Sequence, residues 1–402
     1  MTSVQRAWAL SFVAISSAVL FACVGDSSVT PPLDGGVDSS VPVDAGVQET
    51  ASNDAAGCDG SVCNGTCVTT DNDPANCGRC SHSCGTGQCS SGVCQPTLID
   101  GDPNGDGGTI ITSLTTEQGD DNPQGPAQHI FWGETGTAGG VFQDNVLGGN
   151  MIKLSTSGVA ASTNVVASGS SVFWFSLNLG GPPQPILEGQ VSTANSQTAF
   201  STVNGSAIQS IMFDATNAAV AGSLTVNGTQ FAFFKCPVST KTCTLYTFSG
   251  TLQGNVATDG TKIYVADSGD GIIDDMTLGA GSNESDIVQN QATPTLLRID
   301  GTFIHWFDSG TKAIERQSLT GSTAKQLATT ADAITGLAAD PVNVYWTDPT
   351  AGVLSYAPIT GSGPNTAYVS SLGPSSSPMR LVRDSAFLYF THNAAIYRVA
   401  LP

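Results

Sequence analysis

The sequence has few basic residues and few histidines, and it lacks the short motifs that mark several classes of enzyme. Its 402 residues include 13 Lys and Arg against 33 Asp and Glu, which gives a net charge of -20 at pH 7. Because binding to nucleic acid depends on neutralising phosphates with Lys and Arg, this balance argues against a nucleic-acid partner. The four histidines form no HExxH metal motif, and no G-x-S-x-G nucleophile elbow is present. An acidic surface instead favours cations or basic partners, and it also keeps a protein soluble.

A hydrophobic run long enough to cross a membrane is missing at the N-terminus. Arg6 is the only basic residue before Arg79, and it precedes an apolar run from Ala7 to Ala22. The run is too short for a spanning helix but suits the hydrophobic region of a secretory signal. We therefore expect residues 1–22 to be a signal peptide and the protein to be exported.

The run ends in Leu20-Phe21-Ala22-Cys23. These residues resemble the lipobox of bacterial lipoproteins, in which the cysteine is acylated and becomes the mature N-terminus. The resemblance implies lipid attachment at Cys23. The absence of Asp after Cys23, where Val24 stands, implies the outer membrane of the cell envelope. Phe21 departs from the usual pattern, and plain secretion is the alternative.

Residues 23–57 contain no Lys, Arg or aromatic residue and are rich in Ser, Thr, Pro, Asp, Val and Gly. A segment of this composition cannot bury a core. We expect a disordered tether that connects the lipid anchor to the folded part of the chain.

A cysteine-rich segment, residues 58–95, follows the tether. Its eight cysteines are Cys58, Cys63, Cys67, Cys77, Cys80, Cys84, Cys89 and Cys94. In an exported chain with few aliphatic residues, disulfides replace the missing core. Only Cys236 and Cys243 remain besides Cys23, so all ten of these cysteines can pair. Zinc is the competing interpretation because Cys77-Gly78-Arg79-Cys80 is a CxxC near His82, although a second CxxC at ribbon or finger spacing is missing.

The cysteine-rich segment also carries glycines at regular places among its cysteines. The relevant residues are Asn76, Cys77, Gly78, Cys80, Cys84, Gly87, Cys89, Gly92 and Cys94. In this pattern the segment resembles the stigma-specific cysteine-rich family and its bacterial relatives. The resemblance implies a small extracellular interaction or spacer module without catalytic residues, and the disulfide connectivity stays open.

From residue 126 to residue 392 one short sequence pattern recurs seven times: an extended stretch, usually with an aromatic pair, followed by a polar turn. The copies read HIFWGE, SVFWFS, NAAVAG, KIYVAD, FIHWFD, NVYWTD and FLYFTH. The second members of the pairs are spaced 40 to 46 residues apart, at Trp132, Trp174, Val220, Val265, Trp306, Trp346 and Phe390. This is the period of a β-propeller blade, with the pair on the second of four strands. In five copies an Asp stands five residues before the pair and is expected to end the first strand: Asp214, Asp259, Asp300, Asp340 and Asp384.

Tyr345-Trp346-Thr347-Asp348 resembles the motif of the YWTD propellers of low-density lipoprotein receptors. The resemblance implies an all-β fold, a β-propeller over residues 96–402. Seven copies predict seven blades. Six blades are the alternative, because the copy around Val220 keeps neither the aromatic pair nor the acid.

The ends of the chain predict how the ring closes. The seventh copy ends with its third strand, Ala395 to Ala400, two residues before the end of the chain. The β-like stretch 109–115 is expected to supply the missing outer strand and so to cover an open sheet edge. Cys236 and Cys243 flank a short turn, and a bond between them would staple a hairpin of the third copy.

The candidate binding face consists of five of the seven residues that stand two positions after the second member of each pair. These are Glu134, Asp267, Asp308, Asp348 and His392. If the fold is correct, they lie at one end of the ring, where the acids could hold Ca²⁺ or receive a basic peptide. The structural alternative is that each Asp accepts hydrogen bonds from its own turn, and in YWTD relatives the motif acid is structural.

No nucleophile, base and orienting group can be assembled from the spacing of residues. The prediction is a monomeric cell-envelope lipoprotein whose propeller binds a protein or carbohydrate ligand and has no catalytic residues. One alternative is a cation-dependent propeller hydrolase or lyase with Glu134, Asp267, Asp308 and Asp348 around the metal. A passive spacer is the other alternative.

Overall fold

The computed structural model describes residues 58, 60–102, 110–117, 125–135, 139–156, 162–176, 184–203, 206–226, 230–247, 256–277, 284–361, 363–370 and 372–402. All of them belong to one compact unit, residues 55–402. The predicted signal peptide, Cys23 and the predicted tether lie outside the described residues. Within the described part of the chain, no helix is long and apolar enough to cross a membrane.

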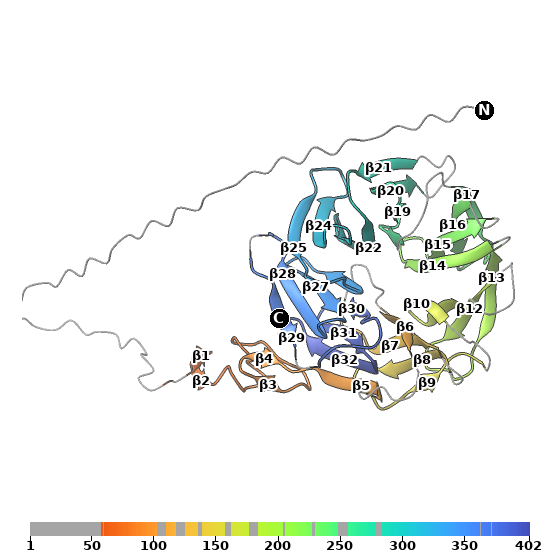
Figure 1. Ribbon diagram of the computed structural model, residues 1–402. Coiled ribbons are helices and arrows are strands. Elements are labelled where there is room, and N and C mark those ends of the chain that lie inside the picture. The colour runs from red at the N-terminus through yellow and green to blue at the C-terminus, as the bar shows by residue number, and fades with distance from the viewer. Residues whose placement is uncertain are drawn as a thin grey trace, which may run out of the picture. The chain divides into compact units, whose positions relative to one another are not determined.

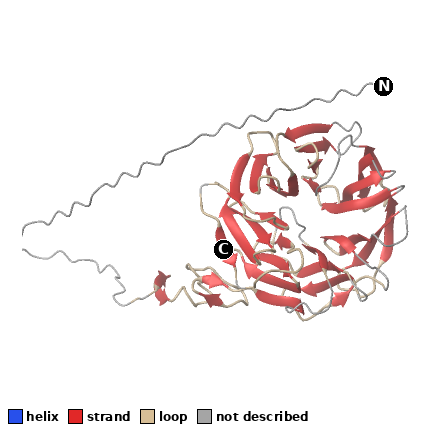
Figure 2. Ribbon diagram, in the orientation of Figure 1, coloured by secondary structure: helices blue, strands red, loops and turns tan. Residues whose placement is uncertain are grey.

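Seven antiparallel sheets of four strands each form a β-propeller (Figures 1 and 2). Blade 1 consists of β6 (Ile111–Thr116), β7 (His129–Glu134), β8 (Gly140–Asn145) and β9 (Ile152–Lys153). Blade 2 consists of β10 (Ser162–Ser168), β11 (Ser171–Ser176), β12 (Gln184–Gln190) and β13 (Thr198–Val203). Blade 3 consists of β14 (Ser206–Asp214), β15 (Ala219–Val226), β16 (Gln230–Pro237) and β17 (Thr244–Thr247). Blade 4 consists of β18 (Val256–Thr258), β19 (Lys262–Asp267), β20 (Ile272–Thr277) and β21 (Glu284–Val288).

The remaining three blades complete the ring. Blade 5 consists of β22 (Pro294–Asp300), β23 (Phe303–Asp308), β24 (Ala313–Ser318) and β25 (Lys325–Thr329). Blade 6 consists of β26 (Gly336–Ala339), β27 (Asn343–Asp348), β28 (Val353–Pro358) and β29 (Thr366–Val369). Blade 7 consists of β30 (Leu381–Arg383), β31 (Phe387–His392), β32 (Ala394–Ala400) and β5 (Thr97–Asp102). The first strands of neighbouring blades contact one another in a closed cycle. The seven-bladed all-β propeller is therefore confirmed.

The hydrophobic cores lie between neighbouring blades, because successive side chains of a strand point to opposite faces of its sheet. Trp174 of blade 2 packs in one core with Phe131 of blade 1. Its neighbour Phe173 packs in another core with Ile211 of blade 3. The aromatic pair thus fills the spaces on both sides of its own blade, which explains why the pair recurs with the blade period.

The third copy is a complete blade, so the six-bladed alternative is wrong. Its second strand, β15, carries the small residues Ala219, Val220 and Ala221 in place of the aromatic pair, and all three are buried. The neighbouring strand β16 supplies the missing volume with Phe233 and Phe234, which enter the cores on opposite sides of the blade. In this blade the aromatic side chains are on the third strand and not on the second, so the repeat pattern does not reveal them.

The ring closes with strands from both ends of the chain, but residues 109–115 do not supply the closing strand. The closing strand is β5, which pairs antiparallel with β32. The stretch that was expected to close the ring forms β6, the first strand of blade 1. Most of β6 is buried, whereas β5 exposes Leu98 and buries Ile99. The more apolar strand, β6, thus takes the inner position of blade 1. The strand β5, which has one buried face, takes the outer edge of blade 7.

The cysteine-rich segment contains two small hairpins, β1 (Ser61–Cys63) with β2 (Thr66–Val68) and β3 (Cys89–Ser90) with β4 (Val93–Cys94). Four disulfides cross-link it: Cys58–Cys67, Cys63–Cys80, Cys77–Cys89 and Cys84–Cys94. A fifth disulfide, Cys236–Cys243, closes the hairpin of β16 and β17 in blade 3. The disulfide-rich character of the segment is thus confirmed.

The cysteine-rich segment packs against the ring beside its closing blade. Cys77, Cys84, Cys89 and Cys94 share one core with residues of blades 6 and 7, among them Tyr345, Tyr368, Leu388 and Val399. His82 Nε2 lies 2.7 Å from the carbonyl oxygen of Leu401, and the Arg79 guanidinium donates to the carbonyl oxygen of Pro402 at 3.2 Å. The segment is therefore attached to the last residues of the chain as well as to the blade.

Candidate functional site

The predicted binding-face residues occupy equivalent places in five blades. Each is the last residue of the second strand of its blade: Glu134 of β7, Asp267 of β19, Asp308 of β23, Asp348 of β27 and His392 of β31. We call the end of the ring where these strands turn into the third strands the acid-turn face. The fold thus places the five residues at one end of the ring.

Asp267 and Asp348 bind the turns that follow them. The Oδ1 atom of Asp267 accepts the backbone N–H groups two and three residues later, at 3.0 and 3.1 Å. The Oδ1 atom of Asp348 accepts the two equivalent N–H groups at 2.9 and 3.0 Å. Both residues are buried. These are Asx-turns, in which the carboxylate stabilises the reversal of the chain.

Asp308 binds two segments of backbone. Its Oδ1 atom accepts the N–H groups of Gly310 and Thr311, at 2.9 and 3.1 Å, and that of Thr293 at 3.1 Å. Its Oδ2 atom accepts the N–H of Ala292 at 2.7 Å. The carboxylate therefore ties the turn between β23 and β24 to the chain that enters β22.

The other two residues of the face also have internal partners. The Trp132 indole N–H donates to Glu134 at 2.7 Å, and burial raises the pKa of the Glu134 carboxyl. His392 Nε2 lies 2.9 Å from the carbonyl oxygen of Gly373, which can only accept, so Nε2 carries the proton. The side chains that were proposed to face a ligand thus hold the ends of their own strands.

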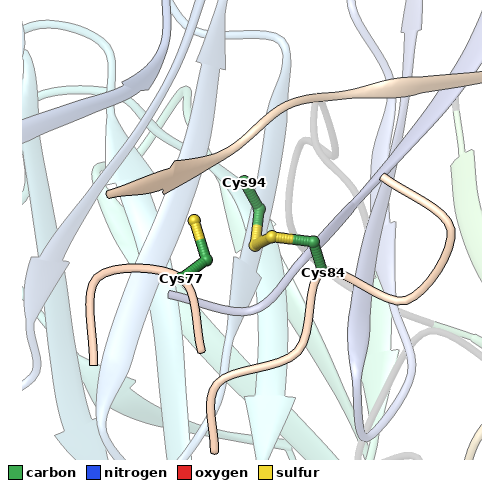
Figure 3. Close-up of side chains that lie close together, drawn as sticks. All are labelled: Cys77, Cys84 and Cys94. Carbon is green, nitrogen blue, oxygen red and sulfur yellow. A yellow bond between two sulfur atoms is a disulfide. The ribbon is translucent and has the colours of Figure 1, made fainter. Parts of the chain in front are cut away.

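The acids of this face do not converge on one ion. Of the described His, Cys, Asp and Glu side chains, only Cys77, Cys84 and Cys94 bring three ligand atoms within 4.8 Å of one another (Figure 3). Cys77 is bonded to Cys89 and Cys84 to Cys94, so none of these sulfurs is the thiolate that binds zinc. The zinc alternative for the cysteine-rich segment therefore does not fit its chemistry.

At the opposite end of the ring, the Asp column pairs with tyrosines. Asp340 Oδ1 accepts the backbone N–H groups two and three residues later, both at 2.7 Å, and its Oδ2 accepts the Tyr345 hydroxyl at 2.6 Å. Asp259 with Tyr264 and Asp384 with Tyr389 repeat the Asp–Tyr hydrogen bond, at 2.6 and 2.7 Å. Burial and the neighbouring carboxylate raise the pKa of all three phenols. The sequence signal for this role is a Tyr five residues after the Asp.

Blade 5 departs from the Asp–Tyr pattern. The position of the Tyr is taken by His305, which is buried and whose Nδ1 has no hydrogen-bond partner in the described part of the chain. Asp300 instead accepts a hydrogen bond from Arg383 of blade 7 at 3.1 Å. The Arg383 guanidinium also donates to the backbone carbonyl of Ala339 in blade 6. One buried arginine thus joins three blades.

Sequence reasoning missed a second acidic group, on the outer strands of blade 4. Asp274 and Asp275 are adjacent on β20, and both are buried. Asp275 is paired, since it binds Lys262 Nζ at 2.6 Å and the Ser285 hydroxyl at 3.1 Å. Neither oxygen of Asp274 has a hydrogen-bond partner among the described residues. Two adjacent acids in an otherwise apolar strand, IIDDMT, are the signal that could have found this group.

Comparison with known proteins supports the fold. No model of a protein family matches the chain, and no curated protein matches it in sequence. The β-propeller domain of Myceliophteria_thermophila Cps50 (Swd1) is similar with a TM-score of 0.55 and 10% identity, covering 77% of this chain and 100% of that chain. Virginiamycin B lyase from Staphylococcus aureus is similar with a TM-score of 0.53 and 12% identity, covering 77% of this chain and 99% of that chain.

A chain of a nidogen/laminin complex is also similar, with a TM-score of 0.41 and 16% identity over 52% of this chain and 82% of that chain. At that score the likeness carries no further argument. The other two likenesses, at 10% and 12% identity, show the fold alone. The comparisons therefore establish a β-propeller, a fold that supports many unrelated functions.

Proposed function

We propose that the protein is a cell-envelope lipoprotein, anchored through Cys23 in the outer membrane, that presents its propeller as a non-catalytic module for binding a protein or carbohydrate. The observation that carries this proposal is the attachment of the cysteine-rich segment to the closing blade. The tether would enter the folded unit at Cys58, within four disulfides. Arg79 and His82 of the segment, which precede β5 in the sequence, contact Pro402 and Leu401. The strand β5 then pairs with β32.

This attachment suits a protein held at one end. The strand β5 is the edge of blade 7 and pairs with β32 alone, so a pull on the chain before β5 would act on a single row of strand hydrogen bonds. Here the disulfide core lies between the tether and β5 and shares buried surface with Tyr345, Tyr368 and Val399 of the ring. A load on the tether would act on cross-linked chain, while the acid-turn face stays available to a partner.

The geometry of the acid-turn face favours binding over catalysis. Of the carboxylates proposed for a metal-dependent hydrolase or lyase, Asp267, Asp308 and Asp348 are buried and accept two, four and two backbone hydrogen bonds. Glu134 accepts the indole N–H of Trp132. A metal would have to compete with these turns for the same oxygens. A rigid set of turns on a closed scaffold is instead a common support for recognition.

The anchor is tested by metabolic labelling with a fatty-acid probe. We expect wild-type protein to be labelled and to fractionate with the outer membrane, and Cys23→Ser to be unlabelled and released. An unlabelled wild-type protein in the medium would support plain secretion.

Binding is tested with the full chain on a surface, using envelope proteins and polysaccharides of its own host as probes. Thr311→Arg with Thr350→Arg places two charges on the acid-turn face, on exposed turns of blades 5 and 6. Thr302→Arg with Val342→Arg places the same charges at the opposite end of the same blades and is the matched control. We expect the first pair to abolish capture of the partner and the second pair to retain it. Equal capture by both pairs would exclude this face, and no capture by wild type would favour a spacer.

A further inference from the structure

The outer strands of blade 4 hold three carboxylates on one face. Asp274 of β20 lies directly opposite Asp286 of β21, and Glu284 of β21 lies opposite Met276, two residues further along β20. Alternate residues of a strand share a face, so these three acids point to the same side of the blade. Met276 on this side packs with Phe233 of blade 3. The acids therefore belong to the wall between blades 3 and 4.

Asp274 is the unusual member of this group. Its residue is 1% exposed, and neither carboxylate oxygen has an N–H or O–H donor among the described residues, because the side chain within hydrogen-bonding reach is the carboxyl group of Asp286. Asp286 and Glu284 are exposed, so the group opens to solvent at its outer side. A buried carboxylate without partners is costly, and native proteins place a donor, an ion or a proton beside it.

Nearby charges do not provide the missing partner. Burial, followed by Asp286, Glu284 and Asp267, raises the pKa of Asp274 to about 8. The lysines of the adjacent strands are committed elsewhere: Lys262 of β19 binds Asp275, and Lys235 of β16 binds Asp214 at 3.1 Å. The side chain with a polar atom that blade 3 adds to the shared core is Tyr246, which carries no amine or guanidinium group. Among the described residues of blades 3 and 4, the wall thus carries several acids and no basic side chain that pairs with Asp274.

We propose that Asp274 and Asp286 bind a hard divalent cation, Ca²⁺, in the wall between blades 3 and 4. Carboxylate oxygens are the ligands that Ca²⁺ prefers, and it accepts irregular sites that water completes, whereas Mg²⁺ requires near-ideal octahedral geometry. The three carboxylates do not all lie within 4.8 Å of one another, and Glu284, opposite Met276 and not opposite Asp274, is not counted among the ligands.

The test is calcium binding to the purified full chain, stripped with chelator and then exchanged into clean buffer. Titration calorimetry should give a dissociation constant on the order of 0.1 to 1 mM, the range of extracellular calcium modules. About 10 mM CaCl₂ should raise the Tm by about 2 to 4 °C.

Matched variants locate the site. Asp274→Asn copies the shape of the protonated carboxyl and should fold, as circular dichroism checks, but it should lose the calcium response. Asp286→Asn should also lose the calcium response. Because Asp286 is exposed, this variant should fold even if Asp274→Asn does not. Asp270→Asn removes the same charge from an exposed turn of the same blade and should keep the wild-type response.

Two results would overturn the proposal. A calcium shift of equal size in wild type and Asp274→Asn, or an equal shift with MgCl₂ at the same concentration, would mean general screening of the acidic chain. The second result is the absence of a calcium shift in wild type, which would mean that Asp274 and Asp286 bind no ion.

Discussion

At the scale of single residues, the acids that recur in the repeat are used to hold turns. Asp340 binds two backbone N–H groups of its own turn and the hydroxyl of Tyr345 with its two oxygens. Asp348, at the other end of the same strand, binds two N–H groups of the next turn. Buried polar groups need such partners, and a repeat that places each acid beside its turn supplies them in every copy. A recurring acid in a propeller is therefore weak evidence for a ligand.

The histidine of blade 5 gives a prediction about acid stability. Burial, and then the positive charges of Arg316 and Arg383, lower the pKa of His305 to about 3. The unfolded chain then binds one more proton than the folded chain between about pH 3 and pH 6.5, so stability falls as the pH falls through this range. The loss should approach about 1.4 kcal/mol per pH unit within it.

The substitution that checks this is His305→Phe, because Phe131 and Phe173 fill the same place in blades 1 and 2. Urea unfolding at several pH values should show a shallower acid decline for the variant. Its stability at pH 7 should differ from wild type by less than about 1.5 kcal/mol, as expected for a hydrophobic residue of similar volume. Parallel pH curves for wild type and His305→Phe would contradict the assignment.

At the scale of the blade, the third copy shows that aromatic side chains can fill the same core from a different strand. Its second strand has small residues at the aromatic positions, and β16 supplies Phe233 and Phe234. Gly222 of β15 pairs with Phe234. A Cβ at Gly222 would lie 2.2 Å from the carbonyl oxygen of Ser210 and 2.8 Å from the Phe234 ring. The absence of a side chain at Gly222 thus allows the ring of Phe234 to lie against the strand.

We therefore expect Gly222→Ala to destabilise the protein by about 1 to 3 kcal/mol, the usual cost of overpacking a core. Guanidinium unfolding measures it. Gly125→Ala is the matched control, since a Cβ there meets no atom within 4 Å, and it should be neutral or slightly stabilising. A cost at Gly222 no larger than at Gly125 would mean that β15 and β16 shift apart without penalty.

The sequence predicts elements of this fold better than it predicts their partners. Where the aromatic pair recurs, it identifies the second strand of its blade because its side chains enter the cores on both sides, and this requirement is local. The strand that closes blade 7 is a question of long-range pairing, and the apolar content of residues 109–115 suggested the wrong one. The pairing of Asp274 with Asp286 depends on the register of β20 and β21, which no local pattern gives. The disulfide connectivity is of the same kind.

At the scale of the whole molecule, two distant parts of the sequence close the ring together. The strand β5 begins three residues after Cys94, and it pairs with β32, whose Arg398 donates a hydrogen bond to Thr86 of the cysteine-rich segment. The last two residues of the chain contact His82 and Arg79. The segment therefore contacts both strands of the seam, by which we mean the pair β5 and β32 that closes the ring. We expect its disulfides to determine how often this pair of strands opens.

Two disulfides of similar loop length allow this to be tested. Cys84–Cys94 has a sequence separation of 10 and lies in the core shared with blade 7, whereas Cys236–Cys243 has a separation of 7 and lies in blade 3. Loop entropy predicts nearly equal costs for removing either, about 2 to 3 kcal/mol. Any difference in the protection of the seam therefore reports the position of the bond and not its length.

We expect Cys84→Ser with Cys94→Ser to increase hydrogen exchange selectively in β5 and β32, because sub-global opening then begins at the seam. Cys236→Ser with Cys243→Ser should increase exchange in β16 and β17 and leave the seam protected. Exchange read by mass spectrometry on the full chain resolves these peptides. Equal protection of β5 and β32 in the two double variants would show that backbone pairing alone holds the ring closed. In that case the cysteine-rich segment would be only a connector between the tether and blade 7.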